Sequence, residues 1–208
     1  MPAGRASTLI LALLRLAHSA QAADFGSWNA FDYVVDFGGR FELTNHVRTR
    51  TEEGFDRMGP MLKWTAYPRF APLAGFYLQP QQTAPGDWHI GGRPFFGFET
   101  RSTVDRTLNL SSRFLLERWY GTSRPAYNRY RGLLRADFVR RRWTPFVHSE
   151  VFAVADGFHS SRNTGGIRVH LSPQVTLEAG YVYDFRSAAW GGNRQAIVTA
   201  LRFQKPRF

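Results

Sequence analysis

Alternation of apolar and polar side chains with a period of two residues is the feature that most constrains this chain. In the segment TLEAGYVYDF, residues 176–185, every odd-numbered residue is apolar or aromatic, whereas the even-numbered ones include Thr176, Glu178 and Asp184. In an extended chain the two sets lie on opposite faces. A soluble sheet would bury the aromatic row in a core, but a strand that crosses a bilayer turns it towards acyl chains and keeps its polar row in a lumen. The segment therefore favours a transmembrane strand.

Similar alternating runs recur along the chain, and no segment shows sustained helical periodicity. Most runs have about the 9 to 11 residues that a tilted transmembrane strand needs. The sequence therefore predicts an all-β fold, an antiparallel transmembrane β-barrel of about 10 to 12 strands. Bacterial single-chain barrels normally have an even number of strands, so we expect one strand to be missed or split, with the error at the amino end. The runs are residues 28–37, 40–50, 60–70, 73–80, 90–100, 107–120, 127–139, 143–154, 162–171, 174–185 and 193–203.

The connections between the runs alternate in length. Short turns on one side and long loops on the other are the asymmetry of an outer-membrane barrel. The predicted tight turns are residues 37–40, 69–72, 140–142 and 172–174, and the predicted long polar loops are residues 49–59, 79–88, 120–127, 155–163 and 186–193.

The amino end has the three parts of a secretory signal. Arg5 is followed by an apolar stretch, and small residues at Ala20 and Ala22 suit a signal peptidase. We expect residues 1–22 to be a cleaved signal peptide and residues 23–208 to be the barrel domain. Loss of Arg5 and Arg15 lowers the formal net charge from +11 to +9. Because an exported basic chain meets the phosphate-rich outer leaflet, we expect outer-membrane lipid, lipopolysaccharide and the barrel-assembly machinery as partners, and no nucleic acid.

Applied to every run, the alternation places charges of both signs on the inner face. An Arg or Lys facing hydrocarbon at mid-depth would cost about 2 to 4 kcal/mol, so a consistent inward placement is preferred. Two interpretations stay open. Arg and Glu can neutralise one another inside a filled barrel, or arginines can line a selective pore, although small barrels are usually filled. The predicted lumen-facing charged residues are Glu42, Arg48, Glu99, Arg101, Arg113, Glu117, Arg129, Arg131, Arg135, Asp137, Glu150, Arg162, Arg168, Glu178 and Arg202.

Aromatic residues gather near the ends of the runs, where the interfacial girdles of barrels lie. The predicted girdle residues are Trp64, Tyr67, Tyr77, Trp119, Tyr120, Tyr127, Trp143 and Trp190.

Arg113 and Glu117 share one predicted inner face but cannot pair with each other. They are four residues apart, about 13 Å along a strand that rises roughly 3.3 Å per residue. Each must therefore find its partner on a neighbouring strand. The candidates are Glu99 or Arg101 before them and Arg129 or Arg131 after them.

Several short motifs, taken together, point to a known family. They are Trp28 at the head of the first run, Glu99-x-Arg101, Arg113 with Glu117, Arg129-x-Arg131, Glu150-x-Phe152, Arg162 with Gly165 and Gly166, and Leu177-x-Ala179-Gly180-Tyr181. Through these motifs most of the mature chain resembles the outer-membrane β-barrel proteins catalogued as domain of unknown function 2490. Leu115 stands where a second Arg is expected before Glu117. The resemblance implies an outer-membrane barrel and carries no established activity.

One segment offers a candidate for catalysis. Residues 158–166 partly resemble the His-x-Ser-Asn motif of outer-membrane lipid A deacylases, in which His is the base and Ser the nucleophile. His159 and Ser161 keep this spacing, but Arg162 separates them from the Asn. No catalytic residue is assigned on this ground. His148 and Glu150 share the inner face, but two ligands are too few for a metal site, so no metal and no cofactor are predicted.

The sequence thus predicts a small monomeric barrel of the outer membrane, with a charged, largely filled lumen and a structural or transport-type role. An alternative is a lipid A-modifying hydrolase of the deacylase kind. A soluble nucleic-acid binder would fit the sequence pI of about 10.8, but it does not fit the signal sequence or the alternation.

Overall fold

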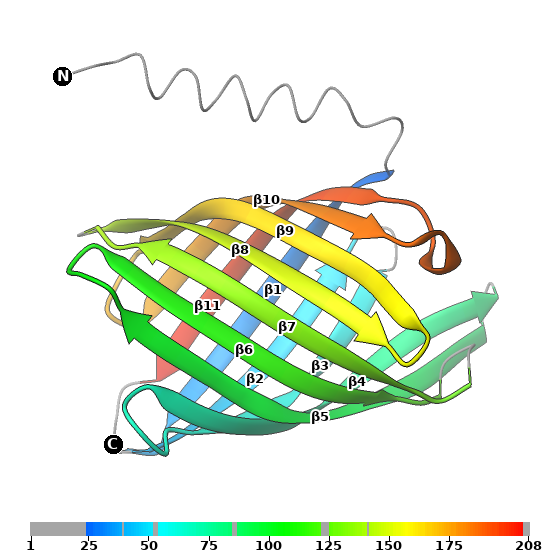
Figure 1. Cartoon of the computed structure of the whole chain (residues 1–208), viewed down its shortest axis with the longest axis horizontal. Coiled ribbons are helices and arrows are strands. Elements are labelled where there is room, and N and C mark those ends of the chain that lie inside the picture. Colours follow the sequence, from blue (N-terminus) through cyan, green and yellow to red (C-terminus); the bar gives the residue numbers. More distant parts are fainter. Residues whose placement is uncertain are drawn as a thin grey trace, which may run out of the picture.

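Eleven strands form one closed barrel in the computed structural model (Figure 1). The structure describes residues 24–38, 40–51, 54–84, 87–121, 125–140 and 142–205. The signal peptide predicted at residues 1–22 lies outside these ranges and stays a prediction. Among the described residues, no helix is long and apolar enough to cross a membrane. The strands are β1 (Asp24–Asp36), β2 (Phe41–Arg50), β3 (Gly54–Trp64), β4 (Phe70–Ala84), β5 (Asp87–Thr103), β6 (Leu108–Trp119), β7 (Tyr127–Phe138), β8 (Trp143–Val154), β9 (Gly157–His170), β10 (Val175–Arg186) and β11 (Arg194–Lys205), with the short 3₁₀ helix η1 (Ala188–Trp190) before β11.

The barrel closes through a parallel pair. Consecutive strands are antiparallel neighbours, and β1 (blue in Figure 1) pairs with β11 (red) from Asp24↔Arg194 to Val35↔Lys205. With eleven strands the first and the last run in the same direction, so the closing ladder must be parallel. The expectation of a missed or split strand is therefore wrong for the described chain, and each of the eleven alternating runs overlaps a different strand of the barrel.

The two ends of the barrel differ less in loop length than the sequence predicts. We call the end that holds the β1–β2 connection the turn end, and the opposite end the loop end. At the loop end, most of residues 79–88 and 155–163 are strand, because β4 continues to Ala84, β5 begins at Asp87 and β9 begins at Gly157. The prediction of long loops there is wrong, since the backbone ladder continues to the pair Ala84↔Asp87.

Side chains close the tight connections of the turn end. Gly38 has a positive φ of 86° and its amide donates to Asp36 Oδ1 at 2.9 Å. In the β5–β6 turn, Asp105 Oδ1 accepts from the Thr107 hydroxyl at 2.7 Å and from the Thr107 and Leu108 amides. These hydrogen bonds lower the pKa of Asp105, because they favour its charged form.

The predicted separation of two faces is observed in β10. Val182 and Asp184 on the inner face are 0% exposed, whereas Leu177 and Phe185 on the outer face are 37% and 46% exposed. Outward side chains of the other strands likewise include many large apolar residues. The alternation read from the sequence is therefore the alternation of the barrel wall.

Register shifts interrupt the strand pairing at three places in the described chain, and one of them changes which residues face inward. Between β2 and β3 the register passes from Arg48↔Arg57 to Thr49↔Phe55, which leaves Asp56 as an extra residue. Asp56 and Arg57 are adjacent in sequence, and because of this extra residue both side chains are buried. Such a bulge can turn a side chain towards the lumen at a position where strict alternation would place it on the outer face.

Candidate functional site

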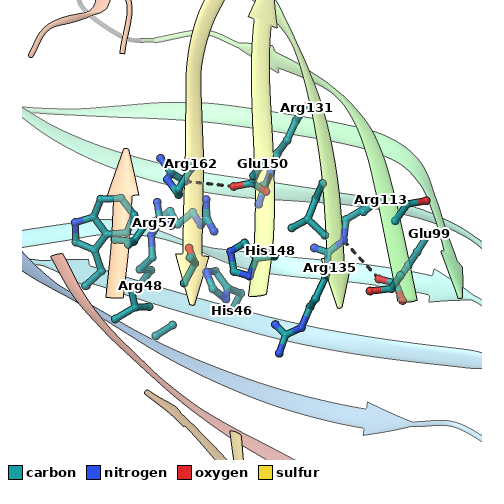
Figure 2. Close-up of a pocket in the computed structure, with 18 residues that line it drawn as sticks. His46, Arg48, Arg57, Glu99, Arg113, Arg131, Arg135, His148, Glu150 and Arg162 are labelled. Carbon is teal, nitrogen blue, oxygen red and sulfur yellow. Dashed lines mark hydrogen bonds and ion pairs between the residues drawn. The ribbon is translucent and has the colours of Figure 1, made fainter. Parts of the chain in front are cut away.

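The interior of the barrel contains two adjoining cavities. The larger, of about 940 Å³, lies at the turn end, where Pro68 and Pro173 line it. The smaller, of about 220 Å³, lies deeper and is drawn in Figure 2; we call it the central cavity. Glu99, Arg113 and Arg135 line both, so the two cavities share a wall.

Around the turn-end cavity the predicted inner charges form ion pairs, some within one strand and others between strands. Solvent reaches several of these side chains, so each pair contributes little to stability. The pairs are Glu42 with Lys63 and Arg202, Asp137 with Arg135 and Arg168, and Glu178 with Arg135 and Arg168, at 2.6 to 3.5 Å.

The cross-strand partners predicted for Arg113 and Glu117 are confirmed. Arg113 Nε lies 3.4 Å from Glu99 Oε2 on β5. Glu117, which is fully buried, accepts from Arg129 Nη2 at 2.5 Å and lies 3.5 Å from Arg131 Nη1 on β7. Arg101 adds a second partner to Glu99 at 2.6 Å. Leu115, which stands between the two charges, is buried against Leu73, Tyr77 and Phe95.

Above the central cavity, arginines and aromatic rings alternate around the inside of the barrel. Each of four inward rings lies between two guanidinium groups; Trp119, for example, has Arg129 at 4.4 Å and Arg93 at 4.7 Å from its ring centroid. The sequence of contacts is Arg50, Trp28, Arg162, Phe152, Arg129, Trp119, Arg93, Tyr77 and Arg57, with 4.4 to 4.9 Å at each step. We call these nine residues, with the carboxylates that pair with them, the arginine–aromatic layer.

The layer lies towards the loop end, because Arg50 is the last residue of β2 and Trp119 is the last of β6. Its two terminal members meet at the bulge of β3, where Asp56 Oδ1 lies 3.4 Å from Arg50 Nε and Arg57 is the next residue. Stacking of a guanidinium on a ring contributes about 0.5 to 1 kcal/mol at exposed sites and more when it is desolvated. A ring of such contacts therefore holds strands from β1 to β9 together across the interior.

Two strands that give no arginine or ring to the layer are covered by the indole of Trp28. Trp28 packs on Val182 of β10 and Ala196 of β11, and both of these are 0% exposed. Small residues on β10 and β11 thus leave the space that the indole of β1 fills.

Four buried carboxylates neutralise part of the positive charge of the layer. Unpaired charges at this depth would cost several kcal/mol each. The pairs are Asp56 with Arg48 and Arg50, Glu117 with Arg129 and Arg131, Glu150 with Arg131 and Arg162, and Asp184 with Arg162 and Arg186, at 2.5 to 3.5 Å.

Arg57 and Arg93 differ from the other arginines of the layer. Within the part of the chain that the structure describes, neither guanidinium forms an ion pair with a carboxylate. Both side chains are nonetheless buried. Their Nε atoms, and Nη2 of Arg93, have no hydrogen-bond partner among the described residues. The layer consequently keeps an excess of positive charge.

The girdle prediction is wrong for Tyr77 and Trp119. Both are buried in the layer, since odd-numbered residues of β4 and β6 face inward, as Leu73 and Leu115 do. Trp64 and Trp143, in contrast, are exposed on the outside. Arg93 and Glu99 are both odd-numbered residues of β5, so the alternation could have placed Arg93 inside. The bulge that turns Asp56 and Arg57 inward, in contrast, leaves no signal in the alternation.

The candidate catalytic pair is arranged differently from the motif. His159 is the extra residue of a β8–β9 irregularity, where Phe152↔Ser160 is followed by Ala153↔Phe158. His159 Nδ1 consequently lies 2.8 Å from the hydroxyl of Ser160, and Ser160 is buried, 1% exposed. The ring of His159 stacks on Trp190 of η1, at 4.2 Å between centroids. The structure thus brings Ser160, and not Ser161, to the histidine.

Metal-ligating side chains do not gather in threes. Among the described residues, no group of three or more His, Cys, Asp or Glu side chains could hold a metal ion. Glu150, which shares the inner face with His148, is instead within ion-pair distance of Arg131 and Arg162.

Comparison with known proteins gives a family and a fold. A model of the family described as "Protein of unknown function (DUF2490)" matches residues 25–195. No curated protein matches the sequence. A solved structure described as the NanC porin is similar, with a TM-score of 0.55 over 84% of this chain and 91% of that chain, at 10% sequence identity. At this identity the likeness shows a porin-like barrel fold alone.

Proposed function

The chain belongs to the DUF2490 family of proteins of unknown function, and we propose that it is an outer-membrane β-barrel of structural or transport type whose lumen is held closed by the arginine–aromatic layer. The observation that carries the proposal is the burial of that layer. Its four rings and the arginines Arg50, Arg57, Arg93 and Arg129 are at most 8% exposed. Side chains packed to this degree leave no room for a hydrated solute.

The outer membrane is proposed from the two faces of the wall. Outward rows of Leu, Phe and Val suit hydrocarbon, and the predicted signal peptide would take the chain across the inner membrane. The surrounding lipid and lipopolysaccharide, the barrel-assembly machinery and a monomeric state are proposed with it.

The proposal is tested first on the wild-type protein. We expect it in the outer-membrane fraction, with different gel mobility before and after boiling, because a folded barrel resists detergent. Reconstituted into planar lipid bilayers, it should give no regular conductance steps, since the layer closes the lumen. Recovery in the soluble periplasm would contradict the location, and porin-like steps would contradict the closed lumen.

A second candidate function, deacylation of lipid A, is favoured by one observation, the 2.8 Å contact between His159 Nδ1 and Ser160 Oγ. A serine activated by a histidine is a nucleophile for acyl transfer. Burial of Ser160 opposes this role, because a lipid acyl chain could not reach its hydroxyl. The closed barrel therefore remains the leading proposal.

We expect lipid A to be unchanged by this protein. Mass spectrometry should find the same acyl chains in cells that have and that lack the wild-type gene. Strains carrying Ser160→Ala, Ser161→Ala or His159→Ala should match them. A missing acyl chain that returns with either serine variant would establish the enzyme instead, because removal of a nucleophile abolishes most of the rate.

A further inference from the structure

The central cavity has a strongly cationic wall. Six arginines and two glutamates line it, together with His46 and His148. Both glutamates already pair with arginines: Glu150 with Arg131 and Arg162, and Glu99 with Arg113. Carboxylates outside the lining pair with Arg48 and Arg135 as well, so Arg57 is the one arginine of this wall without an ion pair in the described chain.

Hydrogen-bond donors without a partner are concentrated on the same wall. The indole Nε1 of Trp28 and the guanidinium Nε of Arg57 and Arg162 are buried and have no partner among the described residues. One ring nitrogen each of His46 and His148 is also buried without a partner; His46 donates from Nδ1 to Asp32, so its Nε2 is a donor only when the ring is protonated. The described oxygen atoms that lack a partner, on Gln79 and Asp184, do not line this cavity. The wall thus offers donors from Trp28, Arg57 and Arg162, and no unpartnered carboxylate oxygen lines it among the described residues.

Figure 2 shows how these groups surround the cavity. His46 and Arg48 of β2, Arg57 of β3 and His148 of β8 extend towards one space, and Arg162 with Glu150 closes one side of it. Trp28 and Arg57 are each less than one-tenth exposed, so bulk solvent has little access to these two side chains. Charge-assisted hydrogen bonds are strongest in such a place.

We infer that the central cavity is a binding site for a small oxyanion of two or more negative charges, of the phosphate class. Arg57 is its principal ligand, because its guanidinium is buried without a carboxylate partner in the described chain. The guanidinium fork suits phosphate oxygens. The volume of about 220 Å³ admits such an ion with a few waters, each of which takes about 30 Å³.

The anion reaches the site from the turn end. The central cavity shares Glu99, Arg113 and Arg135 with the turn-end cavity, and seven cationic and five acidic residues line the latter. A phosphate monoester could place its phosphate in the central cavity and its organic part in the larger one. The inference goes beyond the proposed function. It rests on the closed lumen only for the end from which the anion enters, because binding itself needs no closed lumen.

The test is calorimetric titration of the purified wild-type barrel in detergent with inorganic phosphate, at constant ionic strength set by chloride. We expect saturable binding of roughly one phosphate per barrel. Arg57→Gln should weaken it roughly tenfold or more, because one charge-assisted partner is lost. Ala30→Leu, which fills the cavity without removing a charge, should weaken it too.

Arg168→Gln is the matched control, since it removes an arginine that lines only the turn-end cavity. It should bind phosphate as the wild type does. Parallel titrations with a hexose phosphate and with acetate separate a phosphorylated solute, the free ion and a simple carboxylate. Gel mobility before boiling verifies that each variant is folded.

Two results would overturn the inference. One is the absence of saturable phosphate binding to the folded wild-type barrel, which would indicate that the unpartnered donors of the central cavity bind water instead. The other is an equal loss of binding in Arg57→Gln and Arg168→Gln, which would indicate a general ionic effect. Both results are independent of conductance, so a conducting wild-type barrel that binds phosphate would reject the proposed closed lumen alone.

Discussion

Replacing Glu117 by glutamine should lower the free energy of unfolding of the barrel by about 3 to 5 kcal/mol. Glu117 is fully buried and accepts from Arg129 at 2.5 and 2.7 Å and from the indole of Trp119 at 3.2 Å. Glutamine keeps the volume but removes the charge. Arg129 is then left without its carboxylate, and Arg93, which has no ion pair in the described chain, loses the nearby charge that offsets its own.

Unfolding in urea, in detergent or in liposomes, measures this loss. Glu178→Gln is the matched control, because Glu178 also accepts from two arginines but lies beside the turn-end cavity with 26% of its side chain exposed. The control should lose about 1 kcal/mol or less. Adding Arg129→Gln to Glu117→Gln should restore part of the stability, since the stranded charge is gone. Equal losses in Glu117→Gln and Glu178→Gln would reject the special role of the layer.

Replacing Trp28 by alanine should turn a closed barrel into a conducting one. The indole lines the central cavity on one side, stacks on Arg50 and Arg162, and covers the small inward residues of β10 and β11. Its removal leaves Val182 and Ala196 facing a gap that no other side chain of the layer fills. We expect discrete steps in planar bilayers, with anions carrying most of the current because arginines line the opening.

The change also removes core packing, at a typical cost of about 3 to 5 kcal/mol, so folding must be verified by gel mobility. Trp143→Ala is the control, since Trp143 is 49% exposed on the outer face. It should remain silent in the bilayer. A folded Trp28→Ala barrel without conductance would show that side chains elsewhere close the lumen.

Seven of the residues through which the sequence resembles its family lie in one place in the fold. They come from five different strands, β1, β6, β7, β8 and β9. All belong to the arginine–aromatic layer or are carboxylates and arginines paired with it: Trp28, Glu117, Arg129, Arg131, Glu150, Phe152 and Arg162. Motifs that are short and scattered along the chain thus form one continuous contact network in space.

The sequence by itself determined the all-β fold and the two faces of its regular strands. A period of two residues is a local property of an extended chain, so Glu178 and Asp184 could be assigned to one side and Leu177 to the other without knowledge of any neighbour. The same reasoning excluded a direct pair between Arg113 and Glu117 by distance alone. It also limited their partners to the adjacent strands, where the structure has them.

Only the tertiary structure decided the closure and the interior. The parallel β1–β11 ladder joins the two ends of the described chain, and no local pattern encodes that contact. Bulges at Asp56 and His159 shift the alternation by one residue, because an extra residue fits where the partner strand has none. The alternation of rings and guanidiniums depends on side chains from nine strands reaching one level of the barrel, which the stagger of the closed sheet sets.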